Sequence, residues 1–302
     1  MSINNEEKVK EILQGTIDFH VHSHMSPAYY WDLVEISKQA ASIGMQAIII
    51  KNFYGSSHEQ CNMANKIIGN DMLYASIVIG ECTGGINAAA VKQFASLGGT
   101  NRIVEMPVLD SAQHAVFSGK PAESGISVIK NGKPAPGVIE TLEILAHENL
   151  VLKTGHISPQ ESIELIKIAK GIGVKHVVVT HVTGAPVMAS IEQQLEMVSM
   201  GAVLEHCLAK FLPISVWRNT KRLGNYNSGQ RLGDLDYLNE SIRKVGPEHC
   251  LIATDSGQMS KSYPHEQFKY FVYLLLEMGF TLEDIRTMAK DNPSKILGII
   301  NN

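Results

Sequence analysis

The chain has 302 residues, and its 26 Lys and Arg against 30 Asp and Glu give a net charge of −4. With 44% hydrophobic and 19% charged residues, its composition is that of a globular protein and excludes a disordered, collagen-like or fibrous chain. The mild acidity argues against nucleic acid and anionic membranes as partners. Four cysteines without a C-x-x-C pair argue against a disulfide framework. The first residues resemble no signal peptide and no apolar run is long enough to span a membrane, so we expect a cytoplasmic protein.

Eight short segments rich in β-branched residues alternate with helical stretches along the chain, which predicts a parallel α/β fold. The helix after the fifth segment is well marked, because Ser158-Pro159-Gln160-Glu161 combines an N-cap, a proline at the first helical position and a capping box. No G-x-G-x-x-G follows any predicted strand, which argues against an open doubly wound sheet. The predicted strands are 16–22, 46–51, 73–81, 102–106, 150–156, 175–181, 201–206 and 250–255.

The spacing between strand ends predicts how the sheet closes. Most gaps match one β-α unit, and those after the fourth and seventh strands are about twice as long. We therefore predict a single (β/α)₈ TIM barrel that forms one domain over residues 1–302, with long loops after strands 4 and 7. In the first loop, Asn131-Gly132 is typical of a hairpin turn.

The second long loop, residues 207–233, contains basic residues and no Asp or Glu. On an acidic chain this one-sided charge favours a substrate with an anionic group such as a carboxylate. We expect Arg218 and Arg222 to bind that group. The alternative is a solvated loop without a role in binding. The loop's cations are Lys210, Arg218, Lys221, Arg222 and Arg231.

Polar side chains gather at the carboxyl ends of the predicted strands, where barrels of this type place their chemistry. Strand alternation puts the two histidines of strand 1 on the same face. Each member alone is weak evidence, because a lone histidine is more often a core or surface group. Together, four imidazoles and a carboxylate on one rim suit a divalent metal, Zn²⁺ first and Mn²⁺, Fe²⁺ or Co²⁺ as alternatives. The five residues are His20, His22, His156, His181 and Asp255.

These pieces resemble the amidohydrolase superfamily of metal-dependent barrel hydrolases, in a form without an additional small β-domain. The resemblance implies that His20, His22 and Asp255 bind a first metal ion, and that His156 and His181 bind a second ion in two-metal members. It also implies that Asp255 shuttles the proton. The resembling segments are Ile17-Asp18-Phe19-His20-Val21-His22, Gly155-His156, Thr180-His181, Thr254-Asp255 and the closing Asp291-Asn292-Pro293-Ser294-Lys295-Ile296-Leu297-Gly298.

The group that would bridge two ions is left open between two residues. Two-metal members use a carboxylated lysine or a glutamate from strand 4, where this chain has Glu105. Lys51 follows three isoleucines at the end of strand 2, and a buried free ammonium there would be costly. Lys51 is thus either a carboxylated ligand or catalytic group, or it forms an ion pair with Glu81 or Glu105, or its side chain reaches solvent past the strand end. Glu81 and Glu205 also end predicted strands, and we expect them to bind substrate or to orient the metal ligands.

The predicted activity is hydrolysis. A bound divalent metal lowers the pKa of water toward about 7 and supplies hydroxide to attack an amide, cyclic amide, ester or lactone carbonyl of a small, anionic substrate. His181 or Lys51 would polarise that carbonyl, and Asp255 would act as general acid and base. One alternative is a metal-dependent, non-oxidative decarboxylase of a small carboxylic acid, and another is a non-catalytic ligand-binding barrel. The sequence leaves open whether one or two ions bind and whether the chain forms a homo-oligomer.

Overall fold

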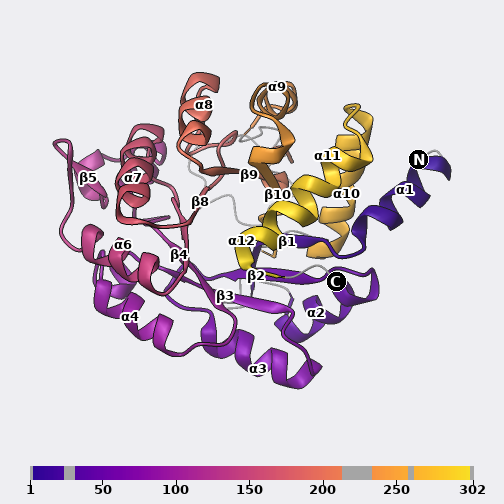
Figure 1. The fold of residues 1–302 in the computed structure, drawn as a ribbon, viewed down its shortest axis with the longest axis horizontal. Coiled ribbons are helices and arrows are strands. Elements are labelled where there is room, and N and C mark those ends of the chain that lie inside the picture. The colour runs from indigo at the N-terminus through magenta and orange to yellow at the C-terminus, as the bar shows by residue number, and fades with distance from the viewer. Residues whose placement is uncertain (1–2, 24–30, 213–232, 258–261, 300–302) are drawn as a thin grey trace.

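The computed structural model describes residues 3–23, 31–212, 233–257 and 262–299. Its central feature within these residues is a sheet of eight parallel strands in the order β1-β2-β3-β4-β7-β8-β9-β10, around which the helices are arranged (Figure 1). The strands are β1 (Ile17–His22), β2 (Ala47–Lys51), β3 (Leu73–Val78), β4 (Asn101–Glu105), β7 (Val151–Lys153), β8 (His176–Val179), β9 (Val203–Cys207) and β10 (Cys250–Ala253).

The first and last strands meet and close the cylinder. The backbone N–H of Asp255 donates to the carbonyl of His20 and that of His22 donates to the carbonyl of Ser256, both at 2.8 Å. The eight parallel strands and this closure confirm the predicted (β/α)₈ barrel. All eight strands lie where the sequence placed them, although several end a few residues earlier.

The helices cover the outer face of the barrel (Figure 1). Because this covers the strands on both faces, they appear in the sequence as nearly continuous apolar runs. α7 begins as predicted, with Ser158 and Glu161 forming the capping box. The helices are α1 (Ile3–Leu13), α2 (Leu33–Ser42), α3 (His58–Ile68), α4 (Ala88–Ser96), α5 (Ala112–Phe117), α6 (Val138–His147), α7 (Pro159–Ile172), α8 (Ile191–Ser199), α9 (Leu235–Val245), α10 (Pro264–Glu277), α11 (Leu282–Arg286) and α12 (Asn292–Leu297). None of the described helices combines the length and apolar character that a membrane span requires.

The inside of the barrel has its own apolar core. Ile17 and Phe19 of β1 pack there with Ile49 of β2, and Ile296 and Leu297 of α12 join this cluster. α12 therefore packs against the amino-terminal part of the strands. At the opposite, carboxyl-terminal end of the barrel, buried polar residues such as His22, Lys51 and Glu105 end their strands.

The connection from β4 to β7 contains the predicted hairpin. β5 (Ile129–Lys130) pairs antiparallel with β6 (Lys133–Pro134), and the turn residues Asn131 and Gly132 have φ of 54° and 69°. This confirms the turn read from the sequence. The connection after β9 begins with a 3₁₀ turn, η3 (Leu208–Lys210). Arg218 and Arg222, the predicted substrate-binding cations of that loop, lie outside the described residues.

Candidate metal centre

Two histidines and an aspartate meet where β1 adjoins the end of β10. His22 Nε2 lies 3.0 Å from Asp255 Oδ1, and His20 Nε2 lies 3.4 Å from the same oxygen. All three side chains are buried, and each offers one ligand atom within 4.8 Å of the others. Strand alternation predicted that His20 and His22 share a face, and the closure of the barrel brings Asp255 to them. This trio has the donor chemistry of a transition-metal site.

The remaining two predicted histidines join this trio from the ends of β7 and β8. The ring of His181 stacks on that of His20 with 4.8 Å between centroids, and the His156 ring lies 5.0 Å from that of His181. His181 Nε2 is 3.8 Å from Asp255 Oδ2. The five side chains that the sequence placed on one rim are therefore neighbours.

The backbone at this rim adopts conformations that side-chain-bearing residues seldom use. His181 and Asp255 both have a φ of 53°, which is the left-handed region that is unfavourable for most residues other than glycine. Gly155 has a φ of 64°, and a Cβ there would lie 2.3 Å from the carbonyl oxygen of Met106. Such strained positions concentrate at functional sites, and here they turn the chain just beyond each strand.

Asp18 links β1, which carries His20, to Thr254, the residue that follows β10. Its Oδ1 accepts hydrogen bonds from the backbone N–H of Thr254 at 3.0 Å and of His20 at 3.2 Å, and its Oδ2 accepts from Thr254 Oγ1 at 2.6 Å. Burial raises the pKa of Asp18 to about 7, against the opposing effect of these hydrogen bonds. Asp18 thus stabilises the site without being one of the candidate ligands, because its oxygens hydrogen-bond to His20 and Thr254.

The histidines are in the neutral form that metal binding requires. Burial lowers the pKa of His20, His156 and His181 well below the ordinary value, and nearby ammonium groups lower it further. The imidazoles are therefore neutral, as a metal ligand must be. Within the described part of the chain, His20 Nε2, His156 Nε2 and His181 Nδ1 are buried without a hydrogen-bond partner. Buried nitrogen atoms of this kind normally have partners, so the donor set fits a divalent cation.

Three buried lysines face three carboxylates around the histidines. Lys51 Nζ is 2.7 Å from Glu105 Oε1, which is the ion pair considered as the alternative to a carboxylated lysine. Lys210 Nζ, on η3, is 3.1 Å from Asp255 Oδ2. Burial opposes the ionisation of Asp255, but Lys210 and the hydrogen bond with His22 outweigh it and hold its pKa below the usual range. The third pair, Lys153 with Glu205, lies at 2.5 Å.

Glu81 and Glu205 differ in position. The third strand ends at Val78 rather than 81, and Glu81 lies in an exposed 3₁₀ turn, η1 (Glu81–Thr83). The prediction that Glu81 ends a strand is therefore wrong, because the backbone turns where its N–H donates to Asp110 Oδ2 at 2.5 Å. Glu205 is fully buried on β9 and contacts His20 Nδ1 at 3.0 Å.

Sequence reasoning overlooked two further members of the site. Lys153 received no role, although a lysine inside the predicted strand 150–156 was a usable signal. His114 on α5 lies with its Nδ1 3.1 Å from His156 Nδ1, and burial, with Lys210, lowers its pKa to about 4. Nothing in the sequence distinguishes His114, because it sits within the long connection after β4.

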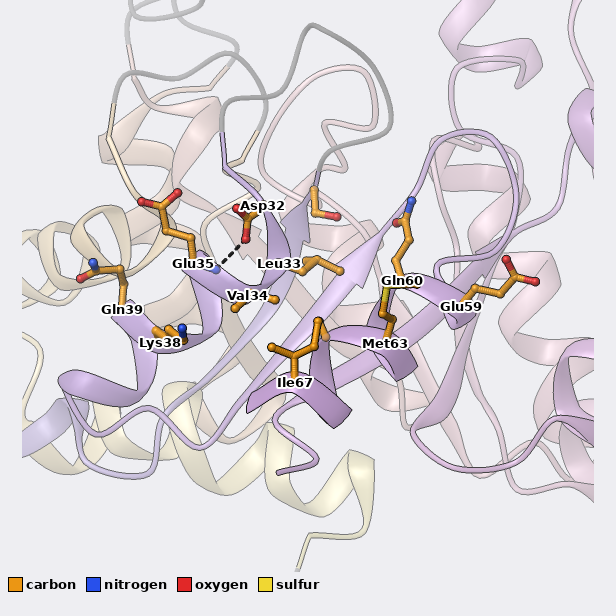
Figure 2. Close-up of a pocket in the computed structure, with 12 residues that line it drawn as sticks. Asp32, Leu33, Val34, Glu35, Lys38, Gln39, Glu59, Gln60, Met63 and Ile67 are labelled. Atoms are coloured by element: carbon orange, nitrogen blue, oxygen red, sulfur yellow. Dashed lines mark hydrogen bonds between the residues drawn. The ribbon is translucent and has the colours of Figure 1, made fainter. Parts of the chain in front are cut away.

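A groove of about 910 Å³ lies outside the histidine cluster, between α2 and α3 (Figure 2). Aliphatic side chains such as Leu33 and Ile67 line it together with the acidic Glu35 and Glu59, and no histidine is among its lining residues. The groove reaches Ser23, next to His22, but the candidate metal ligands themselves do not line it. The chemistry of the site therefore belongs to the barrel end and not to this groove.

Comparison with known proteins supports the fold. Residues 15–205 match the model of a family of unknown function (DUF6282), and no curated protein matches the sequence. Solved structures match over nearly the whole chain. A probable dipeptidase from Pseudomonas aeruginosa has 11% identity and a TM-score of 0.66, with 99% of this chain and 98% of that one covered.

Two further solved structures are named as hydrolases. A zinc-bound amidohydrolase from Burkholderia multivorans has 10% identity and a TM-score of 0.60, over 94% of this chain and 99% of that one. A putative 2-pyrone-4,6-dicarboxylic acid hydrolase from Pseudomonas putida has 13% identity and a TM-score of 0.55, over 95% and 99%. At these identities the likeness concerns the fold, and it confirms the resemblance to amidohydrolase barrels at that level.

Proposed function

The chain belongs to the family of unknown function DUF6282, and we propose that it is a metal-dependent hydrolase of the amidohydrolase type. Its substrate is a small, anionic molecule with an amide, cyclic amide, ester or lactone carbonyl. The observation that carries the proposal is the meeting of His20, His22, His156, His181 and Asp255 at one end of the barrel. Among the described residues, one ring nitrogen each of His20, His156 and His181 is buried without a hydrogen-bond partner. Solved barrels with hydrolase names, one with zinc bound, support the same activity.

The histidines and Asp255 are the residues that would hold the cation. When bound, a divalent ion, Zn²⁺ in the first place, lowers the pKa of water and polarises a carbonyl. His20, His22 and Asp255 form one set of ligands, and His156 with His181 offer a second set. Lys51, if carboxylated, or Glu105 would join the two sets. The 2.7 Å contact between these two residues places both at the same point of the site.

Asp255 is the proposed general acid and base. Its two oxygens face different groups, since Oδ1 lies against His20 and His22 while Oδ2 lies near Lys210 and His181. One oxygen can therefore bind the cation while the other takes a proton from water and passes it to the leaving group. His181 and Lys51 would stabilise the negative charge that develops on the carbonyl oxygen.

An anionic substrate is supported by the cations at the site. Lys210 presents a buried ammonium next to Asp255, and charge-assisted hydrogen bonds to a carboxylate are among the strong polar contacts. Arg218 and Arg222 belong to the same connection and are proposed to contribute to substrate binding. We propose no role for Glu81 in substrate binding, because it lies outside the cluster of contacts around the histidines.

One observation favours a second candidate, a metal-dependent decarboxylase. Lys51 pairs with Glu105 in the described structure, and a glutamate held in an ion pair is less available to bridge two metal ions. A single ion on His20, His22 and Asp255 without an anionic bridge would suit carbon–carbon cleavage of a small carboxylic acid.

The test is elemental analysis of the purified protein after reconstitution with Zn²⁺ or Mn²⁺, followed by assays with lactones, cyclic amides and carboxylic acids. We expect one or two ions per chain, none in a His20→Ala/His22→Ala variant, and hydrolysis lost in Asp255→Asn. His147→Ala is the matched control, because His147 is 84% exposed in its side chain and should not affect the ions. Absence of bound metal in the wild type, or full binding without His20 and His22, would refute the proposal.

A further inference from the structure

Lys153 is a fully buried ammonium inside the barrel. It extends from β7, is 1% exposed, and its Nζ lies 2.5 Å from Glu205 Oε1 on β9 and 3.4 Å from the carbonyl oxygen of Phe19 on β1. A charge at this depth is strongly unfavourable unless it is paired and hydrogen-bonded. Lys153 and Glu205 therefore have to be considered as a unit that ties three strands of the barrel together.

The other oxygen of Glu205 reaches a candidate metal ligand. Glu205 Oε2 lies 3.0 Å from His20 Nδ1, and both side chains are fully buried. A carboxylate oxygen at this distance is placed to accept a hydrogen bond, which puts the hydrogen of the imidazole at Nδ1. Nε2 then has the free lone pair, and Nε2 is the atom that faces Asp255 at 3.4 Å and has no hydrogen-bond partner in the described residues.

We propose that Lys153 and Glu205 form a positioning pair that holds His20 with its hydrogen at Nδ1 and directs Nε2 toward the cation. This inference rests on the proposed metal site. Outer carboxylates that orient a metal-bound histidine are widespread, and here the carboxylate is itself fixed by an ammonium. Without Lys153, Glu205 would lose the contact that fixes its Oε1, and the orientation of Oε2 toward His20 Nδ1 would no longer be set.

The opposing interpretation makes Glu205 a metal ligand. His20, His181, Glu205 and Cys207 also offer donor atoms within 4.8 Å of one another, and Cys207 Sγ is 3.8 Å from His20 Nδ1. A cation on that side would use His20 Nδ1, and it would compete with the Lys153 ammonium, which contacts Glu205 Oε1 and lies 3.3 Å from the same Nδ1. Because Lys153 already supplies positive charge there, the geometry favours a cation on the Nε2 side.

The test uses an apolar replacement of the whole pair, Lys153→Met/Glu205→Leu, because a single substitution would leave one buried charge unpaired and risk unfolding. We measure the affinity for Zn²⁺ by chelator competition, the spectrum of the Co²⁺-loaded protein, and the tautomer of His20 by nitrogen NMR of histidine-labelled metal-free protein. A matched control, Gln194→Leu/Ser241→Ala, removes a buried polar contact between α8 and α9 that is not part of the site.

The positioning role predicts a Zn²⁺ affinity about 10–100-fold weaker in the double variant, with the same number of ions per chain, and loss of the single Nδ1–H tautomer of His20. The control should change neither. Unchanged affinity and tautomer in the double variant would overturn the inference. So would a thiolate-to-cobalt absorption band that disappears in Cys207→Ser, because the cation would then lie on the Glu205 side. Failure of the wild type to bind any ion would refute the proposed function, whereas the tautomer of His20 in metal-free protein still decides the positioning role.

Discussion

His206 makes the stability of the fold depend on pH in a way that can be calculated. It is fully buried on β9, where Nδ1 lies 2.9 Å from Thr183 Oγ1 and Nε2 lies 3.4 Å from Cys250 Sγ. Burial lowers its pKa from 6.5 to about 3. The folded protein therefore keeps this imidazole neutral at pH values where the unfolded chain binds a proton.

The direction and size of the effect follow from proton linkage. Above pH 6.5 neither state is protonated and the fold loses nothing, whereas stability falls as the pH drops from 6.5 toward 3, because only the unfolded chain gains a proton. With one pKa unit worth about 1.4 kcal/mol, this single side chain should remove about 2 kcal/mol between pH 7.5 and pH 5. That is a substantial fraction of the stability of a typical domain.

The measurement is the free energy of unfolding in urea at several pH values between 5 and 7.5, with a chelator present so that metal binding adds no proton linkage. We compare the wild type with His206→Gln, which is close in volume and does not titrate. The other buried histidines contribute to both proteins and cancel in the difference. The variant should lose about 2 kcal/mol less than the wild type over this range. Parallel pH profiles would refute the reasoning, since they would mean that His206 is protonated in the folded state or accessible to solvent.

Three further predictions concern the site. In urea unfolding, Gly257→Ala should lower the free energy of unfolding by more than about 2 kcal/mol and should weaken metal binding, because the new Cβ would lie 1.7 Å from the carbonyl oxygen of His22 at a φ of 86°. The control Gly69→Ala is also at positive φ but has open space around it, so its free energy of unfolding should fall by only about 1–2 kcal/mol. Lys210→Met should raise KM for an anionic substrate about 10–100-fold, the loss of one charge-assisted hydrogen bond, and leave KM for a neutral analogue unchanged; equal effects on both would contradict a role in anion binding. Removal of metal by a chelator should leave the circular dichroism spectrum folded and reduce the stability only by the linkage amount, about 2.7 kcal/mol at a metal concentration of 100 Kd; unfolding of the metal-free chain would show a structural rather than a catalytic ion.

The positions of the strands and of the five converging residues could be predicted from the sequence for a simple reason. In a barrel of parallel strands the carboxyl ends all lie on one rim, so a polar residue that ends an apolar run is placed without knowledge of its neighbours. His20 and His22 on β1, His181 beyond β8 and Asp255 beyond β10 needed only this rule. The rule failed at Glu81, where Ile79 and Gly80 extend the apolar run after pairing has ended at Val78.

The contact between Lys153 and Glu205 was beyond sequence reasoning. Lys153 and Glu205 lie on β7 and β9, which are not neighbours in the sheet, and their 2.5 Å contact crosses the inside of the barrel. Its existence depends on tilt and register, which no local pattern encodes. His114 likewise reaches His156 because the start of α5 lies beside it, where the N-cap Ser111 donates its Oγ–H to the carbonyl of His156 at 2.7 Å. The sequence identified the candidate ligands and named Glu205 as a residue that could orient them, whereas the contacts of Lys153 and His114 emerged only from the three-dimensional arrangement.

The electrical balance of the site gives a further reason to expect an anionic substrate. Lys51, Lys153 and Lys210 each face one carboxylate, at 2.7, 2.5 and 3.1 Å, so these three pairs cancel in charge. The neighbouring histidines are neutral, because burial lowers their pKa values. A divalent cation added to such a neutral site leaves two positive charges in a buried environment, where uncompensated charge is strongly unfavourable. With one divalent ion, one hydroxide and a Lys51 that is not carboxylated, one positive charge would remain at these three pairs, and a carboxylate on the proposed substrate would neutralise it.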